Sequence, residues 1–244
     1  MKILRYKKVS STQDIAKKLA EKNVKEAIVI AKEQTHGRGR YERTWFSPIG
    51  GLWFSILLRP NINPIDSIKL MALAGLVIVK AIRDFTSLSA FIKWPNDIYI
   101  NNKKVCGILI ESSIEDSKLK YVIVGIGLNV NNSFSNTCDY SLKDVTSLRD
   151  ELGKVIDKEA LFKVILKKFK ELYDSFLNKE FNKIFDEYKK YSLIINKNVL
   201  IKSNNKLIKC KVLDIGKDYS LIVKKYNGEI SRLSCEKIFK IDFL

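Results

Sequence analysis

The sequence predicts an α+β protein in which a small β-rich domain follows a larger mixed domain. Before about residue 190, apolar residues at helical spacing alternate with short apolar runs that are typical of buried strands. From Ile194 onward, short strand-like runs alternate with turn residues, a pattern that favours a small β-barrel. We therefore expect one domain at residues 1–190 and a second at 193–244, and a chain of 244 residues is long enough for both.

The elements follow from periodicity and turn chemistry. A helix is expected to begin after Ser11, because serine is a favourable N-cap and apolar residues then recur at helical spacing. Further helices are predicted at 65–85, 144–152, 158–177 and 181–191. Strands are predicted at 27–31, 52–58, 91–94, 97–100, 105–112 and 121–125, and in the tail at 199–201, 208–213, 220–223 and 230–233. Residues 101–103 are turn formers, so 97–112 is expected to be a β-hairpin, whereas 33–45 is expected to be a polar loop.

Composition narrows the class of protein. No apolar run approaches the roughly 20 residues that a membrane span needs, and no apolar stretch of a signal peptide follows the basic residues 1–9. We therefore expect a cytoplasmic protein that does not bind membranes. The first strand follows the first helix closely, which we interpret as leaving no room for an N-terminal DNA-binding domain.

The formal net charge is +17, which favours acidic partners such as nucleic acid, nucleotides or acidic proteins. The same excess of lysine would arise from the base composition of an AT-rich genome, so charge alone leaves both interpretations open. Four widely spaced cysteines and a single histidine, His36, lack the paired spacing of a structural zinc site. No Gly-x-Ser-x-Gly motif accompanies that histidine, so a nucleophilic hydrolase is not predicted either.

Residues 37–40 (Gly-Arg-Gly-Arg) form the first segment with candidate chemistry. The glycines let backbone N–H groups approach an anion, and the arginines offer paired donors to carboxylate or phosphate. The pattern is neither the dinucleotide-binding glycine motif nor a P-loop. A solvated basic loop is the alternative.

Residues 93–97 (Lys-Trp-Pro-Asn-Asp) and 104–111 form the second segment. Asp97 offers a hard oxygen that can bind Mg²⁺ or orient an amine, and Lys104 stands close before Gly107 at a strand edge, where a side chain can reach into a cleft. Edge-protecting charges and turn residues are the structural alternative. The third segment, 125–129 (Gly-Ile-Gly-Leu-Asn), ends a strand in a way that suits a nucleotide, although the pattern alone is weak.

Together, these motifs resemble those of the biotin protein ligase family, in its form without an N-terminal DNA-binding domain. The order and spacing agree along about the first half of the chain, and the matching positions are 11–13, Gln34, 37–40, 45–48, 93–97, 104–111 and 125–129. The chain departs from the family pattern at Gln13, His36 and Glu42, which are expected to affect loop flexibility or biotin affinity.

The resemblance implies a catalytic domain whose mixed β-sheet is similar to that of class II aminoacyl-tRNA synthetases, followed by an SH3-like barrel. It also implies two half-reactions, in which biotin and ATP, with Mg²⁺, form biotinyl-5'-AMP and a lysine of an acceptor protein then takes the biotin. Lys104, Arg38 and Asp97 would be the catalytic residues, the first two by offsetting repulsion between carboxylate and phosphate.

The resemblance further implies the binding residues. The biotin-binding set is Ser11, Thr12, Gln34, Gly37, Arg38, Lys104, Gly107 and Leu109. The set for ATP and the adenylate is Arg38, Gly39, Arg40, Trp45, Asn96, Lys104 and Asn129. Mg²⁺ would arrive on the ATP phosphates, with Asp97 as the candidate protein ligand.

The expected partner is the biotin carboxyl carrier domain of a carboxylase, whose acidic character would complement this basic chain. No specific DNA binding is expected. The sequence does not give the oligomeric state, and a homodimer is compatible with it. Three alternatives remain: a lipoate or octanoate ligase, which the polar Thr12 and Gln34 disfavour, a nucleic-acid binder, which the charge favours, and a scaffold role for the small barrel.

Overall fold

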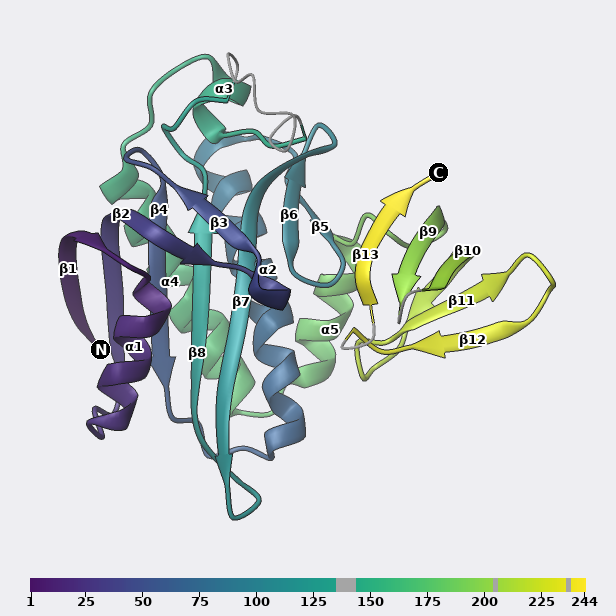
Figure 1. Cartoon of the computed structure of the whole chain (residues 1–244), viewed down its shortest axis with the longest axis horizontal. Helices are drawn as coiled ribbons and strands as arrows, with labels where there is room; N and C mark the ends of the chain where they lie inside the picture. The colour runs from purple at the N-terminus through teal and green to yellow at the C-terminus, as the bar shows by residue number, and fades with distance from the viewer. Residues whose placement is uncertain (135–143, 204–205, 236–237) are drawn as a thin grey trace.

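The computed structural model describes residues 1–134, 144–203, 206–235 and 238–244. Within these residues the chain forms an eight-stranded mixed sheet with helices on both faces and a separate five-stranded antiparallel sheet (Figure 1). The α+β class and the mixed sheet predicted from the sequence are confirmed. Cys138, one of the four cysteines, lies outside the described residues, as do Asn204 and Asn205, turn-forming residues between the strands predicted at 199–201 and 208–213.

The large sheet has the strand order β1-β2-β4-β8-β7-β6-β5, with β3 paired to the far end of β2. Only β1 and β2 run parallel to each other. The strands are β1 (Lys2–Val9), β2 (Ala27–Arg38), β3 (Thr44–Ser47), β4 (Leu52–Leu58), β5 (Phe91–Lys93), β6 (Asp97–Ile100), β7 (Lys103–Glu115) and β8 (Lys118–Leu128). Strand β4 is buried at all seven positions, which explains its nearly continuous apolar sequence.

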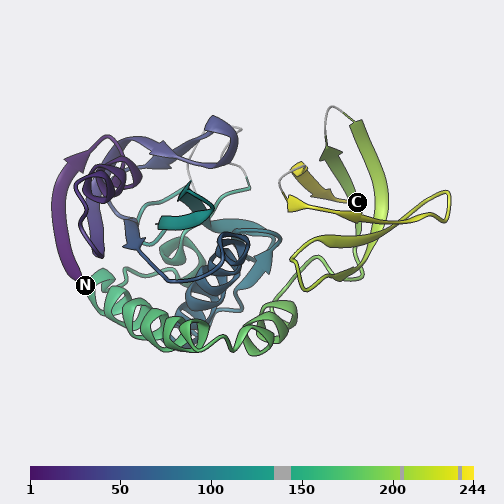
Figure 2. The same cartoon turned by 90° about the horizontal axis from the view of Figure 1, so that it is seen from below.

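Helices cover the large sheet unequally on its two faces (Figures 1 and 2). Helix α1 (Thr12–Glu21) packs alone on one face through Ala16 and Ala20. Helices α2 (Ser67–Thr86), α4 (Lys158–Leu177) and α5 (Phe181–Lys190) lie on the other face, over the main core, and α3 (Leu148–Leu152) is a short helix near one end of the sheet. Helix α1 covers only part of this face of the sheet. The rest of the face is therefore free to form one wall of the site described below.

The prediction of a polar loop over residues 33–45 is wrong. Strand β2 continues to Arg38, a short 3₁₀ turn follows at Arg40–Glu42, and β3 then pairs back onto β2. The polar sequence misled the prediction because this half of β2 leaves the buried sheet and crosses over its face, where both sides of a strand tolerate polar residues. Strand β1 was also missed, because its burial pattern is mostly exposed and its sequence is basic.

Helix α3 is shorter than the predicted 144–152. Residues before it are held by backbone hydrogen bonds instead: the Lys104 N–H donates to the Asp144 carbonyl at 2.8 Å, and the Thr146 N–H donates to the Lys104 carbonyl at 2.9 Å. Pairing with the start of β7 therefore replaces the first helical turn.

The C-terminal sheet has the order β12-β11-β10-β9-β13. Its strands are β9 (Asn198–Ser203), β10 (Lys206–Ile215), β11 (Leu221–Lys225), β12 (Ile230–Leu233) and β13 (Ile238–Phe243), of which β13 was not predicted. Among the described residues no pairing joins β12 to β13, so closure into an SH3-like barrel remains a prediction.

The C-terminal part of the chain shares buried contacts with the part that holds the large sheet. The indole N–H of Trp94 donates to the Tyr219 carbonyl at 2.8 Å, and the rings of Tyr188 and Tyr219 meet edge to face at 5.3 Å. The boundary predicted near residues 190–193 falls between α5 and β9, but the apolar core is continuous across it, so a division into independent domains remains a prediction. No helix in the described part of the chain is both long and apolar enough to cross a membrane.

Candidate functional site

A cavity of about 970 Å³ opens between the open face of the large sheet, the crossing β2–β3 segment and strand β13. Nearly all residues that the sequence assigned to a site line it. They are Ser11, Thr12, Gln34, Arg38, Gly39, Arg40, Trp45, Asn96, Asp97, Lys104, Gly107, Leu109 and Asn129. Gly37 does not line the cavity: a Cβ there would lie 2.3 Å from the Trp45 carbonyl oxygen, so this glycine permits the close approach of β2 and β3.

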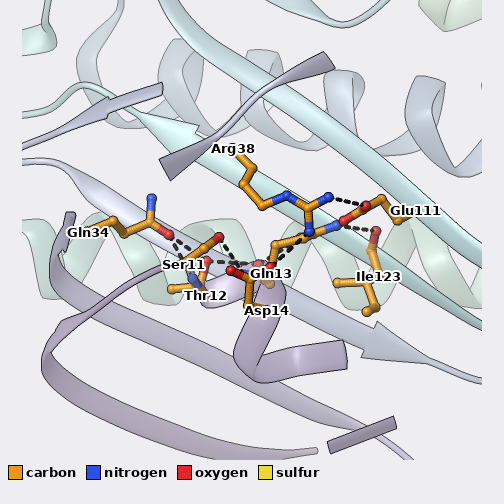
Figure 3. Close-up of polar contacts among 9 residues, drawn as sticks. Ser11, Thr12, Gln13, Asp14, Gln34, Arg38, Glu111 and Ile123 are labelled. Atoms are coloured by element: carbon orange, nitrogen blue, oxygen red, sulfur yellow. Dashed lines mark hydrogen bonds and ion pairs between the residues drawn. The ribbon is translucent and has the colours of Figure 1, made fainter. Parts of the chain in front are cut away.

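One end of the cavity is an uncharged polar network (Figure 3). The Gln34 Oε1 accepts hydrogen bonds from the Thr12 N–H at 2.8 Å and the Thr12 hydroxyl at 3.1 Å. The Thr12 and Ser55 hydroxyls are 2.9 Å apart, and Ser55 donates to the Gln13 Oε1 at 3.0 Å. Hydroxyl and amide groups can both donate and accept, so this end suits a neutral ligand with mixed polarity.

Local folding holds the network in place. Ser11 is the N-cap of α1, and its hydroxyl accepts from the Gln13 N–H at 3.2 Å, as the sequence predicted for a helix start. The Gln34 Nε2 donates to the Ser47 hydroxyl at 2.8 Å, and Ser47 in turn donates to the Trp45 carbonyl at 2.9 Å. The orientation of the Gln34 amide is therefore fixed by β3 on one side and α1 on the other.

Arg38, at the end of β2, is held by two carboxylates at the same end of the cavity (Figure 3). Its Nη1 lies 2.9 Å from Asp14 Oδ1, and its Nη2 lies 2.7 Å from Glu111 Oε1. Burial opposes the charge, but the carboxylates of Glu111 and Asp14 outweigh burial and raise the pKa of Arg38. Arg38 is thus a permanent cation whose two terminal nitrogens already have protein partners.

Lys104 stands near the start of β7 and lines the cavity. Its ammonium nitrogen lies 2.8 Å from Asp97 Oδ2 and 5.0 Å from the ring centroid of Trp45. The side chains of Lys104 and Asp97 are only 24% and 25% exposed, so this pair is screened by water less than a surface pair. The two residues that the sequence placed in separate motifs meet because β6 and β7 are hairpin partners.

The floor beneath Trp45 is made of glycine. Gly107 and Gly127 are paired in register on β7 and β8, and a Cβ at either position would lie 3.0 Å or 2.3 Å from an atom of the Trp45 side chain. The buried indole N–H of Trp45 has no hydrogen-bond partner among the described residues. A buried donor without a partner is costly, so this N–H is a candidate contact for a ligand atom.

The turn after Arg38 docks on the C-terminal sheet. Arg40 donates to the Asn96 Oδ1 at 3.2 Å and to the Cys235 carbonyl at 2.8 Å, while the Tyr41 hydroxyl donates to the Ile238 carbonyl at 2.8 Å. The Arg43 guanidinium stacks 4.1 Å from the ring centroid of Phe239. The C-terminal sheet therefore supports the arginine-rich turn and closes one side of the cavity.

Asn129 lines the cavity, and both atoms of its side-chain amide already make hydrogen bonds within the protein. Its Nδ2 donates to the Thr146 carbonyl at 3.0 Å, and its Oδ1 accepts from Asn132 at 3.0 Å. Asn96 is likewise buried and donates to the Ile108 carbonyl at 2.6 Å. Both side chains shape the cavity through hydrogen bonds to backbone or to other side chains.

The sequence interpretation missed many residues that line the cavity, and three cases show why. Ser55 is a lone polar residue inside the apolar run of β4, which was an available signal. Lys93 was quoted within a motif but given no role; burial lowers its pKa, although the carboxylates of Asp97 and Asp242 act in the opposite direction. The residues of β13, among them Phe239 and Lys240, gave no sequence signal because tertiary packing alone brings this strand to the site.

The cavity thus joins a neutral hydrogen-bonding end to an end with several cations. The second group includes Lys104 with Lys93, Arg40 and Arg43 from three different segments. Such an arrangement suits a ligand pair in which one molecule has a polar head and an acid group and the other has phosphates.

Residues 6–129 match the Biotin/lipoate A/B protein ligase family, which covers just over half of the chain and every motif described above up to Asn129. The chain belongs to this family. The family assignment agrees with the resemblance found in the sequence.

Individual relatives extend the match beyond the family segment. The chain is 37% identical over 223 residues to the bifunctional ligase/repressor BirA of Bacillus subtilis, covering 90% of this chain and 68% of that protein. It is 33% identical over 165 residues to the biotin–[acetyl-CoA-carboxylase] ligase of Paracoccus denitrificans, covering 66% and 69%.

A solved structure is similar over the whole chain. The biotin protein ligase of Aquifex aeolicus, in complex with biotin and ATP, superposes with a TM-score of 0.83 at 28% identity and covers 100% of this chain and 99% of that one. The similarity therefore includes the C-terminal sheet as well as the family segment.

We predict that Gly127→Ala displaces Trp45, because the added Cβ would overlap the indole ring. Overpacking of this kind destabilises by about 1–3 kcal/mol, which urea unfolding would measure. Trp53 and Trp94 are buried, so a red shift in tryptophan emission would report the exposure of Trp45. The same substitution in a Trp45→Phe background is the control and should give no red shift; unchanged emission in the single variant would contradict the prediction.

Proposed function

We propose that this protein is an ATP-dependent biotin protein ligase, which forms biotinyl-5'-AMP and transfers the biotin to a lysine of a biotin carboxyl carrier domain. The observation that carries the proposal is the single cavity that joins the neutral network of Thr12, Gln34 and Ser55 to the ammonium group of Lys104. The family assignment and the biotin and ATP complex of the Aquifex aeolicus relative support it.

The neutral end is the proposed site for the ureido ring of biotin. This ring has a carbonyl that accepts and two N–H groups that donate, and the hydroxyl and amide groups of Thr12, Ser55 and Gln34 offer the complementary set. Ser11, Gly107 and Leu109 line the same cavity and complete the proposed pocket. A pocket with these polar groups rejects a ligand that leaves them unpaired, which is the physical basis for preferring biotin to lipoate.

In the first half-reaction, a carboxylate oxygen of biotin attacks the α-phosphorus of ATP, and the bond to pyrophosphate breaks. Two anions must approach each other, so a fixed cation between them lowers the barrier. Lys104 is the proposed group, because its ammonium lies inside the cavity and the carboxylate of Asp97 holds it in position. Arg38 contributes positive charge nearby, although its terminal nitrogens are paired with Asp14 and Glu111.

The nucleotide is proposed to bind beside Trp45, with Gly39, Arg40, Asn96 and Asn129 around it. Mg²⁺ would enter on the ATP phosphates. Asp97, the candidate ligand from the sequence, is already paired with Lys104, and the described residues contain no group of three or more acidic, histidine or cysteine side chains that could hold a metal. The phosphates would therefore supply most of the ligands, as is usual for Mg²⁺.

In the second half-reaction, the acceptor lysine attacks the acyl carbon, AMP leaves, and the amine loses a proton. Asp97 is the proposed group that orients this amine, since its carboxylate faces the cavity. The proposed partner is the carrier domain of a carboxylase, whose acidic surface complements a chain of net charge +17. A cytoplasmic location and a homodimer remain expectations that accompany this proposal.

The decisive experiment incubates the purified protein with ATP and radiolabelled biotin or lipoate, in separate reactions. We expect an adenylate to form with biotin and label to pass to an added carrier domain. Adenylate with lipoate alone would assign the protein to the other activity named by its family, and no adenylate with either acid would refute the ligase proposal.

We predict that Lys104→Ala lowers the rate of adenylate formation by about 100- to 1,000-fold, the usual loss when one fixed group that stabilises developing charge is removed. Pyrophosphate release from ATP and biotin would measure this. Lys120→Ala is the matched control, because Lys120 is also paired with a carboxylate, that of Glu115, but lies on β8 near its turn with β7 and does not line the cavity. A normal rate of pyrophosphate release in Lys104→Ala would remove this lysine from the mechanism.

We predict that Arg40→Gly lets the adenylate escape and label lysines outside the carrier domain. Arg40 connects the β2–β3 turn to Asn96 and to the Cys235 carbonyl, so its loss frees one side of a closure that keeps water from a hydrolysable anhydride. Biotin incorporation into an unrelated protein, such as serum albumin, would measure escape. Labelling no greater than with the unaltered chain would count against this role.

A further inference from the structure

Two carboxylates that bond Arg38, those of Asp14 and Glu111, have no role in the proposed chemistry, and with Arg38 they form a charged cluster (Figure 3). Asp14 comes from the first turn of α1, Arg38 from the end of β2, and Glu111 from β7. A single guanidinium bonds both carboxylates, at 2.9 Å to Asp14 and 2.7 Å to Glu111. We call these three residues the carboxylate clasp.

The clasp joins strands that are far apart in the order of the large sheet. Strands β2 and β7 are not neighbours, because β4 and β8 lie between them in the sheet. Arg38 reaches Glu111 only because the second half of β2 leaves the sheet and crosses over its face (Figure 1). The clasp therefore ties the crossing segment to the sheet beneath it and to α1 at its side.

The clasp lies beside the neutral network of the cavity. Asp14 is next in sequence to Gln13, and Arg38 itself lines the cavity. Arg38 is the last residue of β2, and the same strand includes Gln34, whose side-chain oxygen accepts a hydrogen bond from Thr12. Opening of this crossing segment would therefore both break the neutral network and uncover the ligand.

The charges of the clasp indicate a positioning role. Asp14 and Glu111 carry negative charge and would not bind an anionic ligand themselves, and they occupy both terminal nitrogens of Arg38. The guanidinium fork is suited to bonding two carboxylates at once. The side chains are 34–40% exposed, so each pair is individually weak and sensitive to salt. A weak, salt-sensitive bond suits a closure that must open during each turnover.

We propose that Asp14 and Glu111 are positioning residues that, through Arg38, hold the crossing β2–β3 segment closed over the neutral end of the cavity and slow the escape of the bound acyl-adenylate. The closure itself rests on the two ion pairs of Arg38. The identity of the retained ligand rests on the proposed function.

Hydrogen exchange on the ligand-free protein tests the closure independently of any activity. We expect the amides of residues 37–45 to exchange about three- to tenfold faster in an Asp14→Asn/Glu111→Gln double variant, as loss of two partly exposed ion pairs implies. Both changes keep the side-chain shapes and remove only charge. Glu115→Gln is the matched control, because Glu115 is on the same strand and pairs with Lys120 away from the cavity.

Salt provides a readout that a general loss of stability would not produce. Between about 0.01 M and 1 M salt the Debye length falls from roughly 30 Å to 3 Å, so exchange in residues 37–45 should accelerate in the unaltered chain and in Glu115→Gln. The double variant should be nearly insensitive to salt in this segment. Exchange equal in the double variant and the control, or equal sensitivity to salt, would overturn the proposal.

Release of preformed biotinyl-5'-AMP into a solution with excess unlabelled biotin and ATP tests the consequence for the ligand. We expect release about three- to tenfold faster in the double variant, with the rate of adenylate formation at saturating substrates changed less than twofold. Faster exchange with unchanged release would overturn the retention role. If no adenylate forms in the unaltered chain, the proposed function fails, whereas the exchange result still decides whether the clasp holds the segment closed.

Discussion

The packing of Trp45 against two glycines is the constraint on which the site depends. Gly107 and Gly127 face each other on neighbouring strands, and the indole ring occupies the space that side chains would fill. This contact lets the crossing β2–β3 segment approach the sheet closely enough to roof the cavity. A third glycine, Gly37, allows β2 and β3 to meet at the same place. Without these approaches the arginine-rich turn would have no fixed position relative to Lys104.

Charge is distributed around the cavity by pairing rather than by simple accumulation. Lys104 is held by Asp97, and Arg38 is held by Asp14 and Glu111, so the two cations that the motifs emphasise are both neutralised locally. Arg40 and Arg43 instead rest on the backbone and an aromatic ring of the C-terminal sheet. Paired charges cost less to bury and are fixed in direction, which suits a site where a carboxylate must approach a phosphate.

The C-terminal sheet is part of the site as well as an appendage to the fold. Strand β13 lines the cavity, and the Tyr41 hydroxyl and the Arg40 guanidinium both donate to carbonyls at or just before that strand. The buried contact between Trp94 and Tyr219 links this sheet to the residues that precede Asn96. Movement of the C-terminal sheet would therefore displace both the arginine-rich turn and the motif that contains Asp97.

The sequence by itself determined the elements whose pattern is local. The buried strand β4, the helix α4 and the N-cap at Ser11 were readable because periodicity and capping depend on neighbours within a few residues. It also indicated the family, and nearly all of the residues that it assigned to a site line the cavity, because the motifs preserve order and spacing. Tertiary structure alone decided that β2 continues into the predicted loop, that β1 and β13 are strands, and that Arg38 bonds Glu111 across two intervening strands. Those features depend on contacts between residues distant in sequence, and exposed or mixed-polarity strands have no periodic signal of their own.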